Sequence, residues 1–197
     1  MRALFIGLLG LGLAACGSSA EPSYYALASR PQVEASSQRG AAKLLELRRP
    51  GIAGYLDRAE IVHRVVDYKL NVQSGERWAE PLGDMVGRVF AQDLAARLPE
   101  SSVFIENGAI AASADAVVAI DIVRFDSAAD GTVHLEAQVA IETTGDAKVT
   151  KARRIKLEAK PDSGSTPALV AAMSGLLATL SDTVAQMARD QGKLNGG

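Results

Sequence analysis

The residue types that carry out most enzymatic chemistry are sparse and scattered in this sequence. The two histidines, His63 and His134, lie far apart along the chain and have no metal-ligand spacing. There is no G-x-x-x-x-G-K-[S/T] loop to hold the phosphates of ATP and no G-x-S-x-G nucleophile elbow. A serine triad built from distant residues would leave no such signature. We therefore predict no catalytic residue, no metal site, and no cofactor other than a covalent lipid.

That lipid is predicted from the only cysteine, Cys16. Met1-Arg2 is a short positive segment, residues 3–13 form an apolar run, and Leu13-Ala14-Ala15 precedes the cysteine. A run of about a dozen apolar residues is too short to span a bilayer as a helix and is typical of a secretory signal. Because Leu-Ala-Ala-Cys matches the bacterial lipobox, we predict a signal peptide at 1–15 and lipidation of Cys16. An ordinary signal peptide with an incidental cysteine is the alternative.

The rest of the composition limits the partners. The formal net charge of -2 provides no basic surface for nucleic acid and no polybasic patch for anionic lipid. Residues 16–22 are expected to be a short lipidated tether, which keeps the folded body near the membrane. The residue directly after the lipidated cysteine usually sorts bacterial lipoproteins between the two membranes. Gly17 at that position, rather than Asp, favours the outer membrane facing the periplasm, with the inner membrane as the alternative.

Residues 54–82 contain the elements around which we expect the fold to be built. The β-branched run at 61–66 predicts a buried strand, and after a turn the chain runs to Trp78. From Pro81, apolar residues recur at spacings of three and four, which predicts a helix that ends at Pro99.

This stretch also resembles a known family. The segments Tyr55-Leu56-Asp57-Arg58, Ile61-Val62-His63-Arg64 and Arg77-Trp78-Ala79-Glu80-Pro81-Leu82 are similar to those of the ABC-type transport auxiliary lipoproteins. These PqiC-like proteins accompany phospholipid-handling MCE-type ABC transporters in the Gram-negative envelope. The chain has Ala59-Glu60 where the family usually has Pro-Gln, and His63 where it has Thr. The specific motifs lie only in residues 55–82, whereas the order of elements fits most of the mature chain.

The second half of the chain is expected to complete one sheet. Residues 103–105 predict a short strand, paired in parallel with the strand before the helix through a right-handed crossover. Residues 116–125 are typical of a central strand, and the alternation over 133–142 indicates a strand with one wet face. With a strand at 149–157 they form a predicted antiparallel meander.

A second helix is predicted from Thr166 to about Arg189. Its apolar stripe consists of Leu169, Met173, Leu176, Leu180, Val184 and Met187. The predicted fold class is therefore α/β: a single domain at 23–191 with a mixed parallel and antiparallel sheet and at least two long helices. A flexible tail is expected at 192–197.

The candidate partner-binding residues belong to the family-like stretch: Tyr55, Asp57, Arg58, Trp78 and Glu80. For Trp78 the alternative is a core anchor.

Two further residues of this stretch have a structural and a functional interpretation. Arg64 is expected to point inward, where its guanidinium needs a carboxylate, and Asp57 and Glu80 are the nearest candidates. A buried pair that braces the strand-to-helix junction is the structural interpretation. The functional interpretation is a surface where Tyr55, Asp57, Arg58 and Trp78 meet another transporter subunit. His63 is expected to be a polar strand residue, with an interface role as the alternative, and His134 a solvated one.

The resemblance implies a non-catalytic, membrane-anchored accessory protein. Its implied partners are the MCE-domain periplasmic subunit of an ABC transporter, with the permease and ATPase in the wider system. A structural envelope lipoprotein and a lipid-anchored envelope hydrolase are the alternatives. The sequence leaves open the transported molecule, its direction, and whether the protein forms a homo-oligomer.

Overall fold

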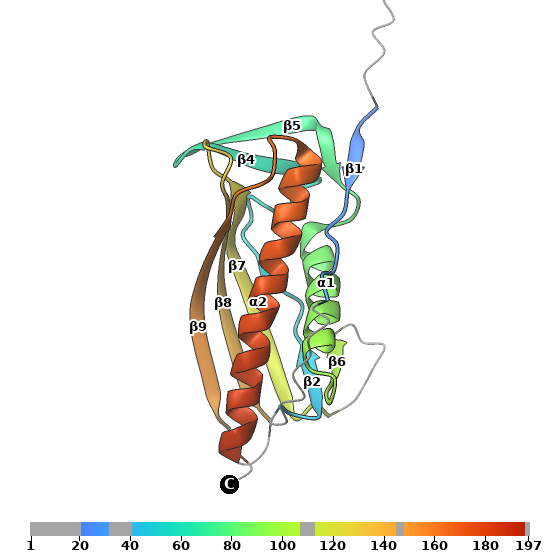
Figure 1. The fold of residues 1–197 in the computed structure, drawn as a ribbon, viewed down its shortest axis with the longest axis vertical. Helices are drawn as coiled ribbons and strands as arrows, with labels where there is room; N and C mark the ends of the chain where they lie inside the picture. Colours follow the sequence, from blue (N-terminus) through green and yellow to red (C-terminus); the bar gives the residue numbers. More distant parts are fainter. Residues whose placement is uncertain (1–20, 32–40, 107–112, 145–147, 196–197) are drawn as a thin grey trace, which may run out of the picture.

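The computed structural model describes residues 21–31, 41–106, 113–144 and 148–195, so Cys16 and the predicted signal peptide lie outside it. In these ranges the chain forms one nine-stranded sheet with two helices packed on one face (Figure 1). The elements are β1 (Ser23–Tyr25), β2 (Leu44–Leu47), β3 (Gly51–Ile52), β4 (Glu60–Val66), β5 (Lys69–Trp78), α1 (Leu82–Arg97), β6 (Ser102–Ile105), β7 (Ala116–Ser127), β8 (Val133–Thr143), β9 (Thr150–Ala159) and α2 (Thr166–Asn195).

The long strand β7 is the centre of the sheet. It pairs in antiparallel with β8, and β8 pairs in the same way with β9, which confirms the predicted meander. Along its other edge β7 pairs in parallel with β2, then β3, then β4. The predicted mixed sheet in a single domain is therefore confirmed.

The predicted crossover partner of β5 is wrong. Strand β6 does follow α1, but it pairs in parallel with β2, at the opposite side of the sheet from β5. The reason is that both edges of β5 are occupied, by β4 in antiparallel and by β1 in parallel. Helix α1 therefore carries the chain across the sheet to the free edge of β2.

The core lies between the helices and the inner face of the sheet. All six residues of the predicted α2 stripe are buried, as are the inward residues of β8 from Val133 to Ile141. Over Thr166–Gln191, α2 is long and apolar enough to cross a membrane, but 61% of that window is buried. Because its apolar side packs against the sheet and α1, α2 is a core helix of this domain.

Helix α2 also extends past its predicted end at Arg189, to Asn195. The segment expected as a flexible tail, 192–197, therefore begins inside the helix. Gln191 accounts for the extension, because its side-chain amide donates to the carbonyl of Val149 at 2.6 Å and so ties the last turns to the sheet.

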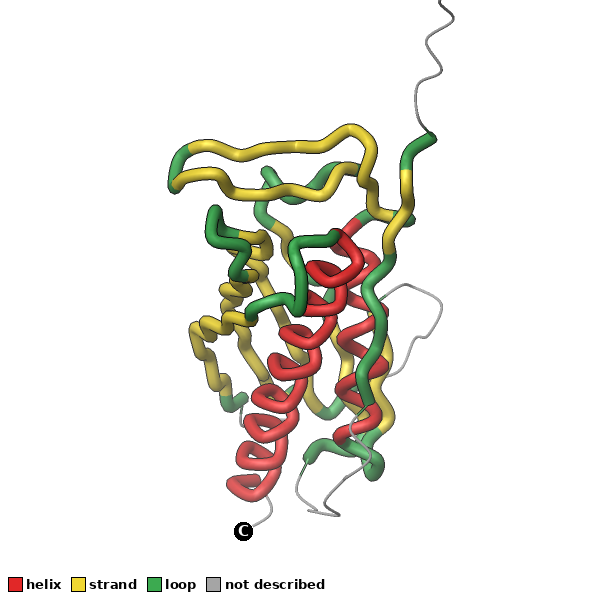
Figure 2. The backbone as a smooth tube through the Cα atoms, turned by 45° about the horizontal axis from the view of Figure 1, so that its top comes forward, coloured by secondary structure: helices red, strands yellow, loops and turns green. Residues whose placement is uncertain are grey.

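The N-terminal segment is fastened along the two helices (Figure 2). Leu27 is 3% exposed, and the amide of Ala28 donates to the hydroxyl of Ser174 on α2. The hydroxyl of Ser29 and the amide of Arg30 both donate to Asp93 on α1, at 2.6 and 2.8 Å. A pull on the chain before this segment is therefore transmitted to the core.

Candidate functional site

Asp126, near the end of β7, is the centre of a buried polar cluster. Its side chain accepts a hydrogen bond from the Tyr55 hydroxyl at 2.7 Å, from Arg64 Nη2 at 2.9 Å and from Arg124 Nε at 2.9 Å. Asp126 is 1% exposed, and the guanidinium carbon of Arg64 lies 5.5 Å from the centroid of the Tyr55 ring. A buried carboxylate is tolerated when it is paired and hydrogen-bonded in this way. We call these four residues the Asp126 cluster.

The cluster raises the pKa values of Tyr55 and Arg64. Burial, followed by the hydrogen bond to Asp126 and the charge of Asp126, raises the pKa of Tyr55 to about 12. The hydrogen bond to Asp126 raises the pKa of the Arg64 guanidinium above its ordinary value. Near neutral pH, Tyr55 therefore remains a neutral donor and Arg64 a cation, so the cluster has a bracing role.

The cluster also corrects the predicted partner of Arg64. Arg64 points inward, with 19% of its side chain exposed, but its carboxylate is Asp126 and not Asp57 or Glu80. Asp57 is exposed, and Glu80 pairs with Arg88. The only signal for Asp126 in the sequence is its position as an acidic residue next to the predicted central strand.

A second group of polar residues surrounds an open pocket where β5 leads into α1. The pocket has a volume of about 350 Å³ and is lined by Asp57, Arg58, Ala59, Trp78, Glu80 and Pro81. Trp78 is 5% exposed, and its backbone amide donates to the carbonyl of Ala59 at 2.7 Å. The Trp78 pocket, as we call it, thus has a buried indole in its wall and charged groups at its rim.

Four of the five predicted partner-binding residues, all except Tyr55, meet at this pocket. Tyr55 belongs to the Asp126 cluster instead, two residues from Asp57 but on a different side of the chain. Trp78 is part of the hydrophobic core, as the alternative interpretation of the sequence has it. Partner binding itself stays a prediction.

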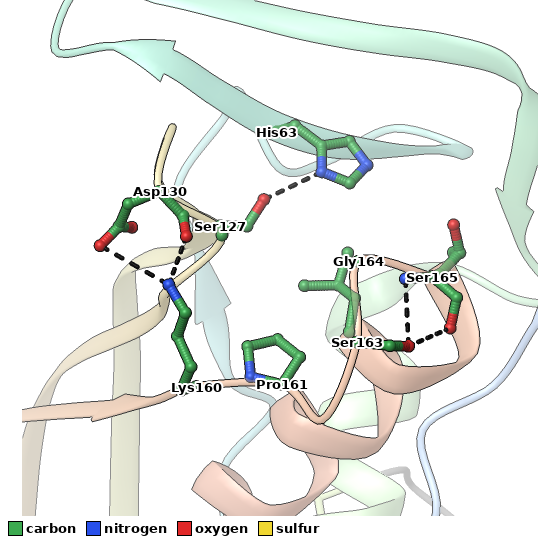
Figure 3. Close-up of a pocket in the computed structure, with 11 residues that line it drawn as sticks. His63, Ser127, Asp130, Lys160, Pro161, Ser163, Gly164 and Ser165 are labelled. Carbon is green, nitrogen blue, oxygen red and sulfur yellow. Dashed lines mark hydrogen bonds and ion pairs between the residues drawn. The ribbon is translucent and has the colours of Figure 1, made fainter.

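A third feature left no signal in the sequence. A pocket of about 280 Å³ lies between β4, the end of β7 and the loop before α2 (Figure 3). In it His63 Nδ1 lies 2.9 Å from Ser127 Oγ, and His63 Nε2 lies 3.9 Å from Glu76 Oε2. The hydroxyl of Thr166 donates to the same carboxylate, and across the pocket Lys160 contacts Asp130.

The grouping of Ser127, His63 and Glu76 has the residue types of a hydrolytic triad, but its geometry is that of a structural link. Ser127 is only 5% exposed, which limits the access of a substrate to its hydroxyl. The distance of 3.9 Å between His63 and Glu76 exceeds a hydrogen bond. Among the described residues, no group of three His, Cys, Asp or Glu side chains could hold a metal ion. The contacts join the β4–β5 hairpin to β7 and to the start of α2.

Comparison with known proteins gives a family and a fold. The sequence profile of the ABC-type transport auxiliary lipoprotein component matches residues 25–185. A crystal structure of a protein from Xanthomonas campestris, 21% identical, superposes with a TM-score of 0.73 and covers 88% of this chain and 98% of that one. An uncharacterized protein, 19% identical, gives 0.72 with 85% and 98% covered. At these identities the likeness shows the fold alone. No sequence with a curated description matches.

Proposed function

This chain belongs to the ABC-type transport auxiliary lipoprotein family, which makes it an envelope lipoprotein that assists ABC-type transport, and from this premise we propose a more specific role. The protein is a non-catalytic accessory component of an MCE-type system that moves phospholipids or other hydrophobic compounds across the envelope. Its direct partner is the MCE-domain periplasmic subunit. A lipid on Cys16 holds it at the outer membrane, facing the periplasm.

The Trp78 pocket is the observation that supports a docking role. Asp57 and Arg58 are exposed, and within the described ranges neither has a charged partner. Arginine is one of the residue types enriched at interaction hot spots, and here Arg58 stands beside an exposed carboxylate at the rim of a pocket. The charges also allow a partner to be selected by complementarity.

The place of the pocket fits a membrane-anchored adaptor. Trp78 pairs in register with Tyr25 of β1, so the pocket adjoins the strand closest to the predicted anchor. The segment that follows β1 is fastened to Asp93 and to α2. The proposed mechanism is therefore geometric: the lipid fixes the pocket at the membrane, and the pocket holds the transporter subunit there.

The two long helices support this role rather than lipid carriage. The apolar stripe of α2 is buried against the sheet, so it is occupied by core packing and is not free to hold an acyl chain. Binding of the transported molecule is therefore assigned to the transporter subunits.

Co-purification tests the docking surface. We expect Arg58→Glu to lower the recovery of the MCE-domain subunit from detergent-solubilised membranes, measured by mass spectrometry, by about tenfold, which corresponds to about 1.4 kcal/mol. The matched control is Arg153→Glu, which makes the same charge reversal at an exposed position of β9. Strand β9 lies at the opposite edge of the sheet from β5. Trp78→Ala is unsuitable because removing a buried aromatic side chain costs about 3–5 kcal/mol of folding free energy.

The outcome separates the alternatives. Unchanged recovery with Arg58→Glu would remove the Trp78 pocket as the docking surface. Recovery of peptidoglycan fragments without MCE or permease subunits would favour a structural envelope lipoprotein.

The envelope hydrolase has a specific observation in its favour, the 2.9 Å contact between His63 and Ser127. It is tested by measuring ester and phospholipid hydrolysis by the purified lipoprotein. We expect no activity above background. Hydrolysis that disappears in Ser127→Ala while the fold is retained would replace the docking proposal with an enzymatic one.

A further inference from the structure

The large hydrophobic side chains that remain exposed in the described part of the chain gather at one end of the molecule. They are Tyr24 on β1, with 63% exposure, and Val65, Val66 and Tyr68 on the β4–β5 hairpin, with 39%, 44% and 93%. Figure 1 shows β1 and the hairpin at the upper end, opposite the C-terminus, with β1 beside the end of β5 that leads into α1 and the hairpin turn at the other end of β5. We call this surface the hairpin end.

Tyr68 has no structural reason to be aromatic. It is the second residue of the two-residue turn Asp67-Tyr68, and the ladder closes between Val66 and Lys69. Polar residues and glycine are the usual choice in such turns. With 93% of its surface exposed, the Tyr68 side chain contributes almost nothing to core packing. A solvent-exposed aromatic residue beside two exposed valines indicates a surface that contacts something else.

The chain enters the domain at the same end. The first described residues, from Glu21, lead into β1 beside the hairpin (Figure 1). Cys16 precedes Glu21 by five residues, which span at most roughly 18 Å when fully extended. A lipid on Cys16 would therefore hold the hairpin end next to the bilayer surface.

We infer that the hairpin end rests on the membrane that carries the anchor, with Tyr68, Val65 and Val66 in the lipid headgroup region. This inference rests on the lipidation of Cys16 in the proposed function, but not on the identity of the transporter. Tyrosine suits this location because its ring is apolar and its hydroxyl reaches water. Helix α2, which runs from the hairpin end to the opposite end, then stands away from the membrane (Figure 1).

The charges around the tip favour an apolar contact over an electrostatic one. Asp67 and Lys69 flank Tyr68 and carry opposite charges, so the tip has little net charge. Binding through Tyr68 and the valines should therefore change little with salt, unlike that of a basic patch. It orients the domain on the bilayer, whereas the lipid on Cys16 supplies the attachment itself.

A depth measurement on the acylated full chain tests the inference. Cys16 is the only cysteine, and acylation blocks its sulfur, so Lys69→Cys introduces a single free thiol for a fluorescent label while Tyr68 stays in place. The protein is reconstituted in vesicles of phosphatidylethanolamine and phosphatidylglycerol that contain headgroup-nitroxide lipid. We expect several-fold stronger quenching at position 69 than in the control Thr150→Cys. Thr150 is exposed at the start of β9, near the C-terminal end of α2.

A second variant assigns the contact to the apolar residues. Adding Tyr68→Ser and Val66→Ser to Lys69→Cys should lower the quenching to the level of the control, while the anchor still holds the protein on floated vesicles. Both positions are exposed, so the fold should survive, and circular dichroism checks this.

Three other outcomes would overturn the inference in distinguishable ways. Equal quenching at positions 69 and 150 would show that the hairpin end stays in water. Quenching that fades as the protein is diluted in lipid would assign the surface to a second copy of the chain. Failure of the wild-type protein to float would remove the anchor. Loss of the MCE subunit alone would affect only the docking proposal.

Discussion

Two polar side chains from the same short stretch of sequence lie in opposite environments, one buried and one exposed to solvent. Tyr55 and Asp57 are separated by one residue, yet Tyr55 donates to the buried Asp126 and Asp57 lines the open Trp78 pocket. In the Asp126 cluster, the carboxylate of Asp126 accepts hydrogen bonds from three side chains, and the residue is 1% exposed. At the rim of the Trp78 pocket, the charges face solvent.

The difference in burial between these two groups distinguishes residues that stabilise the fold from residues that are available to bind a partner. A buried charge must be satisfied inside the fold, so the removal of any partner leaves an uncompensated group and lowers stability. An exposed charge contributes little to stability and remains available for a partner. The Asp126 cluster should therefore respond to mutation through folding, and the Trp78 pocket through docking.

Asp126→Ala should have the largest effect on folding. It leaves Arg64 and Arg124 without their shared carboxylate and the Tyr55 hydroxyl without its acceptor. Because both arginines are partly exposed, we expect a loss of about 1.5–3 kcal/mol of unfolding free energy, the range for hydrogen bonds to charged groups. Denaturant unfolding measures the loss. The matched control is Asp57→Ala at the pocket rim, which should change the free energy of unfolding by no more than about 0.5 kcal/mol. Equal effects at both positions would contradict the division between the two regions.

Tyr55→Phe should have a smaller, pH-dependent effect. It keeps the ring but removes the donor to Asp126, which lowers the free energy of unfolding near neutral pH by about 1–2 kcal/mol. The pKa of Tyr55 is raised to about 12 in the folded protein, from 10.0. The stabilisation is therefore complete below pH 10 and is lost as the pH rises towards 12.

The measurement is denaturant unfolding of wild type and Tyr55→Phe at several alkaline pH values. We expect the gap between their free energies of unfolding to narrow from pH 10 upwards, because only the wild type loses a phenol proton at this site. A gap that stays constant up to pH 12 would show that the Asp126 cluster does not hold that proton.

Local patterns made much of the fold predictable. The alternation over β8 and the stripe of α2 depend only on spacing within one element. The inward face of β8 and the apolar stripe of α2 are buried as expected. The pairing of β6 failed because it depends on which strand edges remain free, which is a property of the whole sheet. The end of α2 was missed because Gln191 is held by Val149, a residue on another element.

The same distinction applies to the candidate site. The Trp78 pocket was predictable because its residues flank one hairpin, and the pairing of Glu60 with Arg77 brings the two flanks together. The Asp126 cluster was not, because β4 and the end of β7 meet only in the folded sheet. His63 and Ser127 meet for the same reason.

The smallest expected effect concerns the one ion pair at the pocket rim. Glu80 pairs with Arg88, and their side chains are 37% and 44% exposed. Glu80→Gln should therefore lower the free energy of unfolding by only about 0–1 kcal/mol, and by less at high salt, where exposed pairs are screened. Thermal unfolding at low and high salt measures both. A loss comparable to that of Asp126→Ala would mean that the rim is also part of the folding network. A small loss together with weaker recovery of the MCE subunit would place the role of Glu80 in docking.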